Sequence, residues 1–558
     1  MLWVAVGILS GYILASVWPN VPVKLLVIFA LVFSMASVVI AVRAPLFGLQ
    51  MGRRLVWWGS CFLLAGTCLA WAWHEVRVQR PSEDWATLPP REATLTLRIM
   101  RNFTPRPGSD SVGGLAKVVE APEVLHELQD QNIEFYVRLN FQDDPPARGS
   151  TVEVLGLLNY LPTSPPVAND EKAADSVRFR NFLHAQGAWF ELSRARILRV
   201  VAPPDAWTRW LTSQHARVEA ILKNGPDVLE NKYSGIYEAF LLGEPSRLDE
   251  KRGAFTVSGE IYLFAISGLH VGVLAATLWW LLRKIPGVPH AVGEVFTLGV
   301  VWLYIEIAGG SPSARRAGLM LTLYLLAKWV ARARSPLAAV IVAGVATLII
   351  DPLALNNSGF QLSYGVVLGL ILYASLLRAA IESRWRPWRD VPPASLAPWK
   401  KCVVWLWNRL FDVLTTSWTA LLCSASLTAE FFGVFSVYNL LLGAVFFPLA
   451  CSTLGSGAIA FVAGIVGFPP FTWLAWLANA LGLLTVGLMY AIAAVFLPLP
   501  GFFTYLQIIP PVAGSFATLA ILAAMLLAQP RNRLPRWWYF ALPVLILALF
   551  ALFTARPL

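Results

Sequence analysis

The chain of 558 residues is 57% hydrophobic and only 14% charged, with a mean hydropathy of +0.60. Soluble domains carry roughly 25% charged residues. The composition therefore excludes an ordinary soluble protein and indicates an integral membrane protein. The formal net charge is +11, but lysine and arginine collect in the cytoplasmic loops of membrane proteins. The positive excess does not by itself indicate a nucleic-acid-binding protein.

Three apolar runs open the chain, at residues 2–18, 23–42 and 55–73. Each approaches the length of a membrane-spanning helix, about 20 residues. The first lacks a basic start and a small-residue cleavage site, which predicts a retained span rather than a signal peptide. The loop between the second and third runs contains Arg43, Arg53 and Arg54 and no acidic residue. That loop is predicted to be cytoplasmic, which places the chain from His74 to about Lys232 on the extracytoplasmic side.

Residues 91–200 change to an alternation of period two, separated by turns rich in Pro, Gly and Asp. The predicted strands are "ATLTLRI", "GLAKVVEA", "IEFYVRLNF", "STVEVLGLL" and "AWFELSRARILRV". Five short strands favour a small β-barrel such as an OB-fold, and a β-sandwich is the alternative. We assign residues 74–204 to this extracytoplasmic domain. Apolar residues at helical spacing from Trp207 to Leu222 then predict an interfacial amphipathic helix, within a connecting region of residues 205–253.

Residues 254–558 form the predicted polytopic domain. The three N-terminal membrane helices, within residues 1–73, are a separate region. The short loops "LRKIPG" and Lys328–Arg334 of the polytopic domain, and its long loop 378–401, are basic. All three fall on the cytoplasmic side when the passes are counted from an external β domain. The predicted fold is a polytopic α-helical membrane protein of about 10–13 spans with an inserted small β-barrel. Beyond Phe432 the number of passes stays open.

Three glycine-containing polar segments interrupt the apolar pattern. They are "LFAISGLHVG" (263–272), "GGSPSARRAGLM" (309–320) and "DPLALNNSGFQLSYG" (351–365). The first lies inside an apolar run typical of a spanning helix. Polar groups within spans are costly and usually face a bundle interior, a partner or water. All three segments lie toward the outer half of the membrane, which favours the mouth of a polar pathway. Alternatively, each is an ordinary cap, with Ser267 bonded to its own helix and His270 to a neighbour.

These segments, in this order, resemble the ComEC family of competence proteins, the membrane channels that admit transforming DNA. The resemblance covers about residues 93–449. "LLGEPSRLDEKRGAFTVSGEIYLFAISGLHVGVL" is similar to the segment that defines the family's competence domain, and the two later segments match its next signatures. In "SLTAEFFGVFSVYNLLLGAVFFPL", Asn439 stands in the family's N-L-L position. "FRNFLHAQGAWFEL" is similar to the end of the family's OB-fold domain.

Two departures from the family pattern limit what the resemblance implies. Tyr262 stands where the family commonly has a histidine before the core motif. Many members also continue into a metallo-β-lactamase-like domain, whereas no two of the six histidines here are close enough to form its H-x-H-x-D-H cluster. We therefore expect no metal site, no cofactor and no nuclease activity in this polypeptide, and we do not expect an enzyme.

The resemblance implies an inner-membrane channel for single-stranded DNA, whose path residues act mechanically rather than catalytically. The predicted path residues are Ser267, Gly268, His270, Gly272, Arg315, Arg316, Gln361, Ser363 and Asn439. Residues 91–200 of the β domain contain 13 basic and 14 acidic residues. The domain has no overall positive charge, so only local clusters are candidates for DNA binding. Those candidates are Arg98, Arg101, Arg106, Arg178, Arg180, Arg194 and Arg196.

No G-x-x-x-x-G-K-[ST] motif is present, so any motor must be another protein. The implied partners are single-stranded DNA, membrane lipids, a surface DNA receptor, a cytoplasmic ATPase or helicase, a single-strand-binding protein and a separately encoded nuclease. The pore is formed by one chain or at the interface of a homodimer. Two other functions remain open. One is a transporter or flippase for another polyanion or lipid-linked substrate, and the other is an intramembrane serine hydrolase that uses Ser267 and His270.

Overall fold

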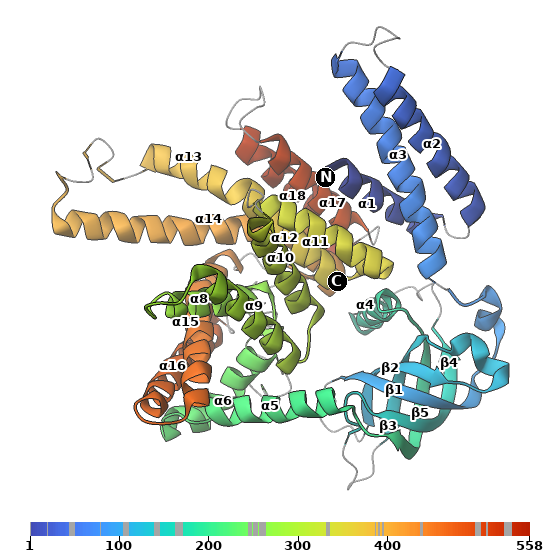
Figure 1. Cartoon of the computed structure of the whole chain (residues 1–558), viewed down its shortest axis with the longest axis horizontal. Coiled ribbons are helices and arrows are strands. Elements are labelled where there is room, and N and C mark those ends of the chain that lie inside the picture. Colours follow the sequence, from blue (N-terminus) through green and yellow to red (C-terminus); the bar gives the residue numbers. More distant parts are fainter. Residues whose placement is uncertain are drawn as a thin grey trace.

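The computed structural model describes residues 2–18, 21–43, 51–78, 80–103, 111–138, 145–161, 171–243, 248, 255, 264–330, 335–385, 387–388, 391–392, 395–435, 439–496, 504–508, 512–528 and 538–557. A large set of helices lies beside a small β-barrel (Figure 1). This arrangement confirms the predicted helical membrane fold with an inserted β domain.

The three predicted N-terminal runs are helices. They are α1 (Leu2–Val17), α2 (Val23–Arg43) and α3 (Met51–Arg77). Small residues let α1 approach α3 closely. A Cβ atom at Gly11 would collide with the carbonyl oxygen of Thr67, and Gly7 lies opposite Gly66.

Five strands close into a barrel in the order β1-β2-β3-β5-β4. They are β1 (Arg91–Asn102), β2 (Ser111–Glu120), β3 (Asn132–Arg138), β4 (Thr151–Tyr160) and β5 (Ala188–Ala202). Paired strands run antiparallel except β3 and β5, which are parallel. Inward-facing side chains such as Leu97, Phe135 and Leu192 fill the barrel and are fully buried. The predicted barrel is confirmed as OB-fold-like, and its closure excludes the alternative β-sandwich.

Helix α4 (Glu171–Ala185) connects β4 to β5 and lies between the barrel and the other helices (Figure 1). Its Leu183 packs with Leu115 of β2 and Ala188 of β5 on the outside of the barrel. The strand pattern does not predict this helix, because only a few apolar residues at its C-terminal end face the barrel. Two short 3₁₀ helices complete the domain, η1 (Glu83–Thr87) and η2 (Glu123–Leu128).

The chain leaves the barrel through α5 (Ala206–Leu222) and α6 (Asp227–Leu242). Helix α5 is the predicted amphipathic helix. Asp205 caps it by accepting a hydrogen bond from the Thr208 N–H at 3.1 Å. Val218 and Leu222 are buried, whereas Trp207 and Trp210 are exposed. Helix α6 is more deeply buried, and its Phe240 belongs to the largest apolar cluster of the bundle.

The remaining described helices form the bundle. They are α8 (Gly268–Leu282), α9 (His290–Ile307), α10 (Pro312–Trp329), α11 (Pro336–Ile350), η5 (Pro352–Asn356), α12 (Ser358–Gly369), a π-helical turn η6 (Leu370–Ala374), α13 (Ser375–Trp385), α14 (Pro398–Phe432), α15 (Asn439–Val466), α16 (Phe471–Phe496), α17 (Ala513–Leu527) and α18 (Trp538–Thr554). Short strands β6 (Val434–Phe435), β7 (Thr504–Ile508) and β8 (Ala555–Pro557) pair beside it.

Within the described residues, six helical segments are long and apolar enough to cross a membrane. They cover residues 23–40, 290–307, 358–385, 398–432, 442–466 and 471–495. Five further apolar helices have 10–17 residues. The protein is therefore a multi-pass membrane protein, and the total number of spans stays a prediction.

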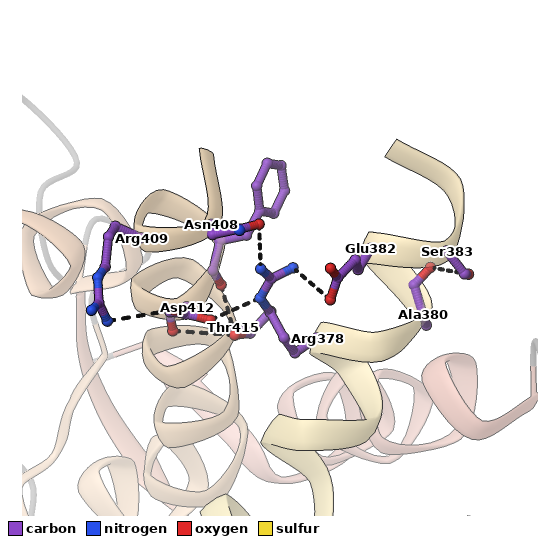
Figure 2. A network of polar contacts seen from close by, with 9 residues as sticks. Arg378, Ala380, Glu382, Ser383, Asn408, Arg409, Asp412 and Thr415 are labelled. Carbon is purple, nitrogen blue, oxygen red and sulfur yellow. Dashed lines mark hydrogen bonds and ion pairs between the residues drawn. The ribbon is translucent and has the colours of Figure 1, made fainter. Parts of the chain in front are cut away.

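Helices α13 and α14 extend together from the bundle (Figure 1) and are joined by a polar network (Figure 2). The Arg378 Nε donates to Asp412 Oδ1 at 2.8 Å, and its Nη2 donates to Asn408 Oδ1 at 2.8 Å. Glu382, which lies on α13 like Arg378, approaches the same guanidinium at 3.9 Å. One arginine therefore connects the two helices.

Candidate functional site

The three polar segments singled out in the sequence meet at the beginnings of three helices. The Ser311 hydroxyl, at the start of α10, donates to the Ile266 carbonyl at 2.9 Å, just before α8. The Ser313 and Ser363 hydroxyl oxygens lie 3.0 Å apart and connect α10 to α12. The helix macrodipole is positive at an N-terminus, so this cluster is favourable for negative charge.

Helix α8 begins at Gly268, within the first polar segment. This corrects the prediction that "LFAISGLHVG" lies inside a spanning helix, because Ser267 is the N-cap residue with extended backbone angles. Ser258 and Glu260, earlier in the same predicted span, lie outside the described residues. A serine at an N-cap satisfies exposed N–H groups, so Ser267 has a local structural role.

His270 is buried and hydrogen-bonded at both ring nitrogens. Nδ1 lies 3.3 Å from the Ser267 N–H and 3.1 Å from the Ser267 hydroxyl, and Nε2 lies 2.9 Å from the Phe240 carbonyl oxygen. Two donors at Nδ1 and an acceptor at Nε2 assign the neutral tautomer with its proton on Nε2. The small cavity beside the ring is lined mainly by apolar side chains such as Leu241 and Leu274. His270 thus ties α8 to the C-terminal part of α6.

The two glycines of this segment differ in their surroundings. A Cβ at Gly268 would lie 3.6 Å from Ala317 of α10, an ordinary packing distance. A Cβ at Gly272 would meet no atom within 4 Å. Among the described residues, α8 therefore has open space beside Gly272.

The adjacent arginines of α10 have opposite environments. Arg315 is half-exposed and pairs with Glu306 through Nε at 3.0 Å and Nη2 at 2.8 Å. Arg316 is only 6% exposed, and its Nη2 donates to the Ser363 hydroxyl at 3.1 Å. Its Nε has no hydrogen-bond partner in the part of the chain that the structure describes. The positive charge of Arg315 is paired, whereas that of Arg316 has no acidic partner among the described residues.

Gln361 belongs to a neighbouring polar cluster that includes two residues missed by the sequence interpretation. Its Nε2 donates to the Leu355 carbonyl at 2.9 Å, and its Oε1 accepts from the Ser515 hydroxyl at 2.8 Å. Ser515, near the start of α17, also donates its N–H to Glu430 at 2.7 Å. Glu430 is the sole acidic residue in the apolar stretch 413–432 of α14, and intramembrane acids are functional candidates. No comparable sequence signal identifies Ser515.

The candidate arginines of the barrel domain do not share one environment. Arg98 and Arg101 lie on β1, Arg178 and Arg180 on α4, and Arg194 and Arg196 on β5. Arg194 lines a surface hollow with Ser111, Tyr136 and Arg138. Arg178 instead lies against Gly433 at the end of α14. Arg106 lies outside the described residues, as does the side chain of Asn439.

Comparisons with known proteins identify the same region of the chain. Residues 240–532, more than half of its length, match the family described as competence protein. The chain is 34% identical over 149 residues to ComE operon protein 3 of Bacillus subtilis (strain 168), covering 26% of this chain and 19% of that protein. It is 32% identical over 165 residues to competence protein ComA of Neisseria gonorrhoeae, covering 27% and 24%. The matches thus span about a fifth to a quarter of these relatives, and no solved structure matches.

Proposed function

The chain belongs to the competence protein family, and on that premise we propose that it conducts single-stranded DNA across the bacterial cytoplasmic membrane during natural transformation. The observation that carries this proposal is the meeting of the N-terminal parts of α8, α10 and α12, where buried Arg316 of α10 bonds to Ser363 of α12 and its Nε has no hydrogen-bond partner among the described residues. Helix N-termini and arginines both attract phosphate. A multi-pass protein with such a cluster is suited to moving a polyanion.

The proposed orientation places the barrel domain outside the cytoplasm, where incoming DNA arrives. The basic loops between apolar segments support this orientation, since lysine and arginine remain on the cytoplasmic side. Arg98, Arg101, Arg106, Arg180, Arg194 and Arg196 are the proposed backbone contacts of the barrel. The hollow beside Arg194 supports this role because it pairs arginines with Tyr136, and aromatic faces stack with bases of single strands.

In the bundle we propose that Ser267, Gly268, His270, Gly272, Gln361, Ser363 and Asn439 shape the path. Arg316 attracts the strand to it, whereas the charge of Arg315 is already paired with Glu306. The partners that accompany this function are a surface DNA receptor, a cytoplasmic ATPase or helicase, a single-strand-binding protein and a separate nuclease. Membrane lipids surround the bundle, and a homodimer is a further arrangement of the pore.

One geometric observation favours a second function, an intramembrane serine hydrolase. Ser267 Oγ lies 3.1 Å from His270 Nδ1, within the range of a nucleophile and its base. However, the other ring nitrogen faces the backbone carbonyl of Phe240, where a triad places a carboxylate. The channel therefore agrees better with the described geometry.

Import of labelled DNA into a strain lacking this chain tests the proposal. We expect labelled DNA to reach the cell surface but not the cytoplasm, and the full-length chain to restore import. Ser267→Ala should retain most of that import, because it removes only a cap worth about 1 kcal/mol, whereas the bulky Ser267→Leu should block it. Normal import without the chain would exclude the channel. Loss of import with Ser267→Ala, in a protein that still folds, would favour the hydrolase.

A further inference from the structure

Arg316 is a charged side chain that is buried with no countercharge in the described part of the chain. It is 6% exposed, and no acidic group lies within ion-pair distance of it among the described residues. Its neighbour Arg315 takes the nearby Glu306, and Glu430 is bonded to Ser515. An unpaired charge in a protein interior is strongly unfavourable unless a partner arrives. An anion would supply the missing countercharge.

The described groups around Arg316 carry no negative charge. They are hydroxyl groups and the N-terminus of a helix. A Cβ at Gly359, in the first turn of α12, would lie 3.2 Å from Arg316 Nη2, so the guanidinium rests against the positive end of that helix. Ser363 accepts from Nη2, which leaves its own proton available to Ser313 or to a ligand. Cation, helix N-terminus and hydroxyl groups are the components of phosphate sites.

We propose that Arg316, Ser313 and Ser363 bind one phosphate group of the polynucleotide backbone during its passage. This assignment rests on the proposed function and makes it specific, because it singles out Arg316 and not Arg315 as the phosphate ligand. A phosphodiester carries one negative charge, which balances the one charge of the guanidinium. The unpartnered Nε and the serine hydroxyls supply directional hydrogen bonds to its oxygens.

The test measures binding of a dye-labelled oligothymidylate to the full-length chain in phosphatidylcholine nanodiscs at several salt concentrations. Arg316→Gln should weaken binding about tenfold, as expected for loss of a hydrogen-bonded charge. It should also reduce the slope of log K against log salt by about 0.7, the value for one phosphate contact of a single strand. Arg315→Gln is the matched control and should leave affinity within about twofold and the slope unchanged, since its charge is already paired. Arg316→Lys should restore much of the slope, which excludes a folding defect.

Two further probes identify the source of the phosphate. An uncharged methylphosphonate oligonucleotide should bind the wild type and Arg316→Gln equally. In phosphatidylglycerol nanodiscs the difference between the two proteins should persist. Its disappearance there would assign the site to a lipid headgroup and overturn the proposal. Equal affinities and slopes for the wild type and Arg316→Gln would also overturn it.

The import experiment separates this proposal from the proposed function. If the wild type restores DNA import while Arg316→Gln binds and imports as well as the wild type, the phosphate site is wrong and the channel stands. If the wild type restores no import but the difference in salt slope persists, the site is right and the channel is wrong.

Discussion

Glu134 is a buried acid on the outer face of the barrel, opposite Leu115 of β2 in the strand register. It is 2% exposed, and its Oε1 has no hydrogen-bond partner among the described residues. It pairs in register with Glu191 on the parallel strand β5. Burial raises the pKa of Glu134, a hydrogen bond from Tyr136 opposes the shift and the charge of Glu191 adds to it, with a net pKa of about 7. The folded barrel therefore holds a proton at Glu134 that the unfolded chain releases at lower pH.

This shift predicts a barrel that is more stable in acid. A carboxyl whose folded pKa is raised contributes stability fully below its unfolded pKa of about 4.5, and that contribution is lost as the pH rises through about 7. The neutral Glu134→Gln should therefore stabilise the domain at pH 8 by about 2–3 kcal/mol, with little effect at pH 4. Hydrogen exchange of β3 amides, compared between the two proteins at each pH, measures this difference. Equal exchange at pH 8 would contradict the prediction.

At single residues, the sequence could predict which side chains are unusual but not which contacts they make. Polarity within apolar segments was enough to select Ser267, His270, Arg315 and Arg316. It could not separate the two arginines, because a helix turns about 100° per residue and only the tertiary structure places one beside Glu306. It also could not distinguish a path residue from a capping residue. The bonds of His270 to Ser267 and Phe240 depend on where α8 begins, which the apolar run around it obscures.

At the scale of elements, one guanidinium connects α13 to α14 by hydrogen bonds (Figure 2). Arg378 is 16% exposed and bridges to Asp412 and Asn408 on the facing helix. Arg409 approaches the other oxygen of Asp412 from its own helix at 3.9 Å and is 66% exposed. Exposed pairs contribute little, whereas a partly buried charge-assisted bond contributes more.

Asp412→Asn should loosen α13 without unfolding the bundle. It removes the charge that Arg378 Nε contacts at 2.8 Å, and the expected loss is about 1 kcal/mol or less after solvent screening. Hydrogen exchange of the α13 amides should then quicken a few-fold. Arg409→Gln is the control and should leave α13 unchanged, because it removes only a long, exposed contact. If both variants quicken exchange equally, Arg378 does not hold the pair together.

Helices and strands were predictable wherever one hydrophobic pattern extended over the whole segment. Strands β1 and β4 alternate between buried and less buried side chains along most of their length, and burial inside a closed sheet favours that alternation. The apolar runs at residues 2–18 and 23–42 likewise coincide with α1 and α2. Helix α4 escaped prediction because its stability comes from contacts with Leu115 and with the bundle rather than from its own pattern. Tertiary packing commonly supplies most of a helix's stability.

At the scale of the whole molecule, the barrel domain contacts the bundle along several separate points. Arg148 Nη1, just before β4, donates to the Gly309 carbonyl at 2.9 Å, in the turn between α9 and α10. Arg178 of α4 lies against Gly433 at the C-terminal end of α14. A cation at a helix C-terminus is favourable. No sequence pattern indicates these contacts, because they join loops and helix ends far apart in the chain.

Gly433→Ala should therefore detach α4 from the bundle. Gly433 has a φ of +65°, a left-handed conformation that costs alanine about 1 kcal/mol, and a Cβ there would occupy the position of the Arg178 guanidinium. We expect faster hydrogen exchange in α4 and unchanged exchange in strands β1 and β4.

Gly443→Ala is the matched control for this substitution. A Cβ at Gly443 in α15 meets no atom within 4 Å, and alanine favours a helix interior over glycine, so this variant should be as stable as the wild type. Arg178→Gln should reproduce the exchange in α4 without straining the backbone at position 433. If it leaves α4 unchanged while Gly433→Ala destabilises the protein, the effect at Gly433 is backbone strain alone. The contact with Arg178 would then not couple the barrel to the bundle.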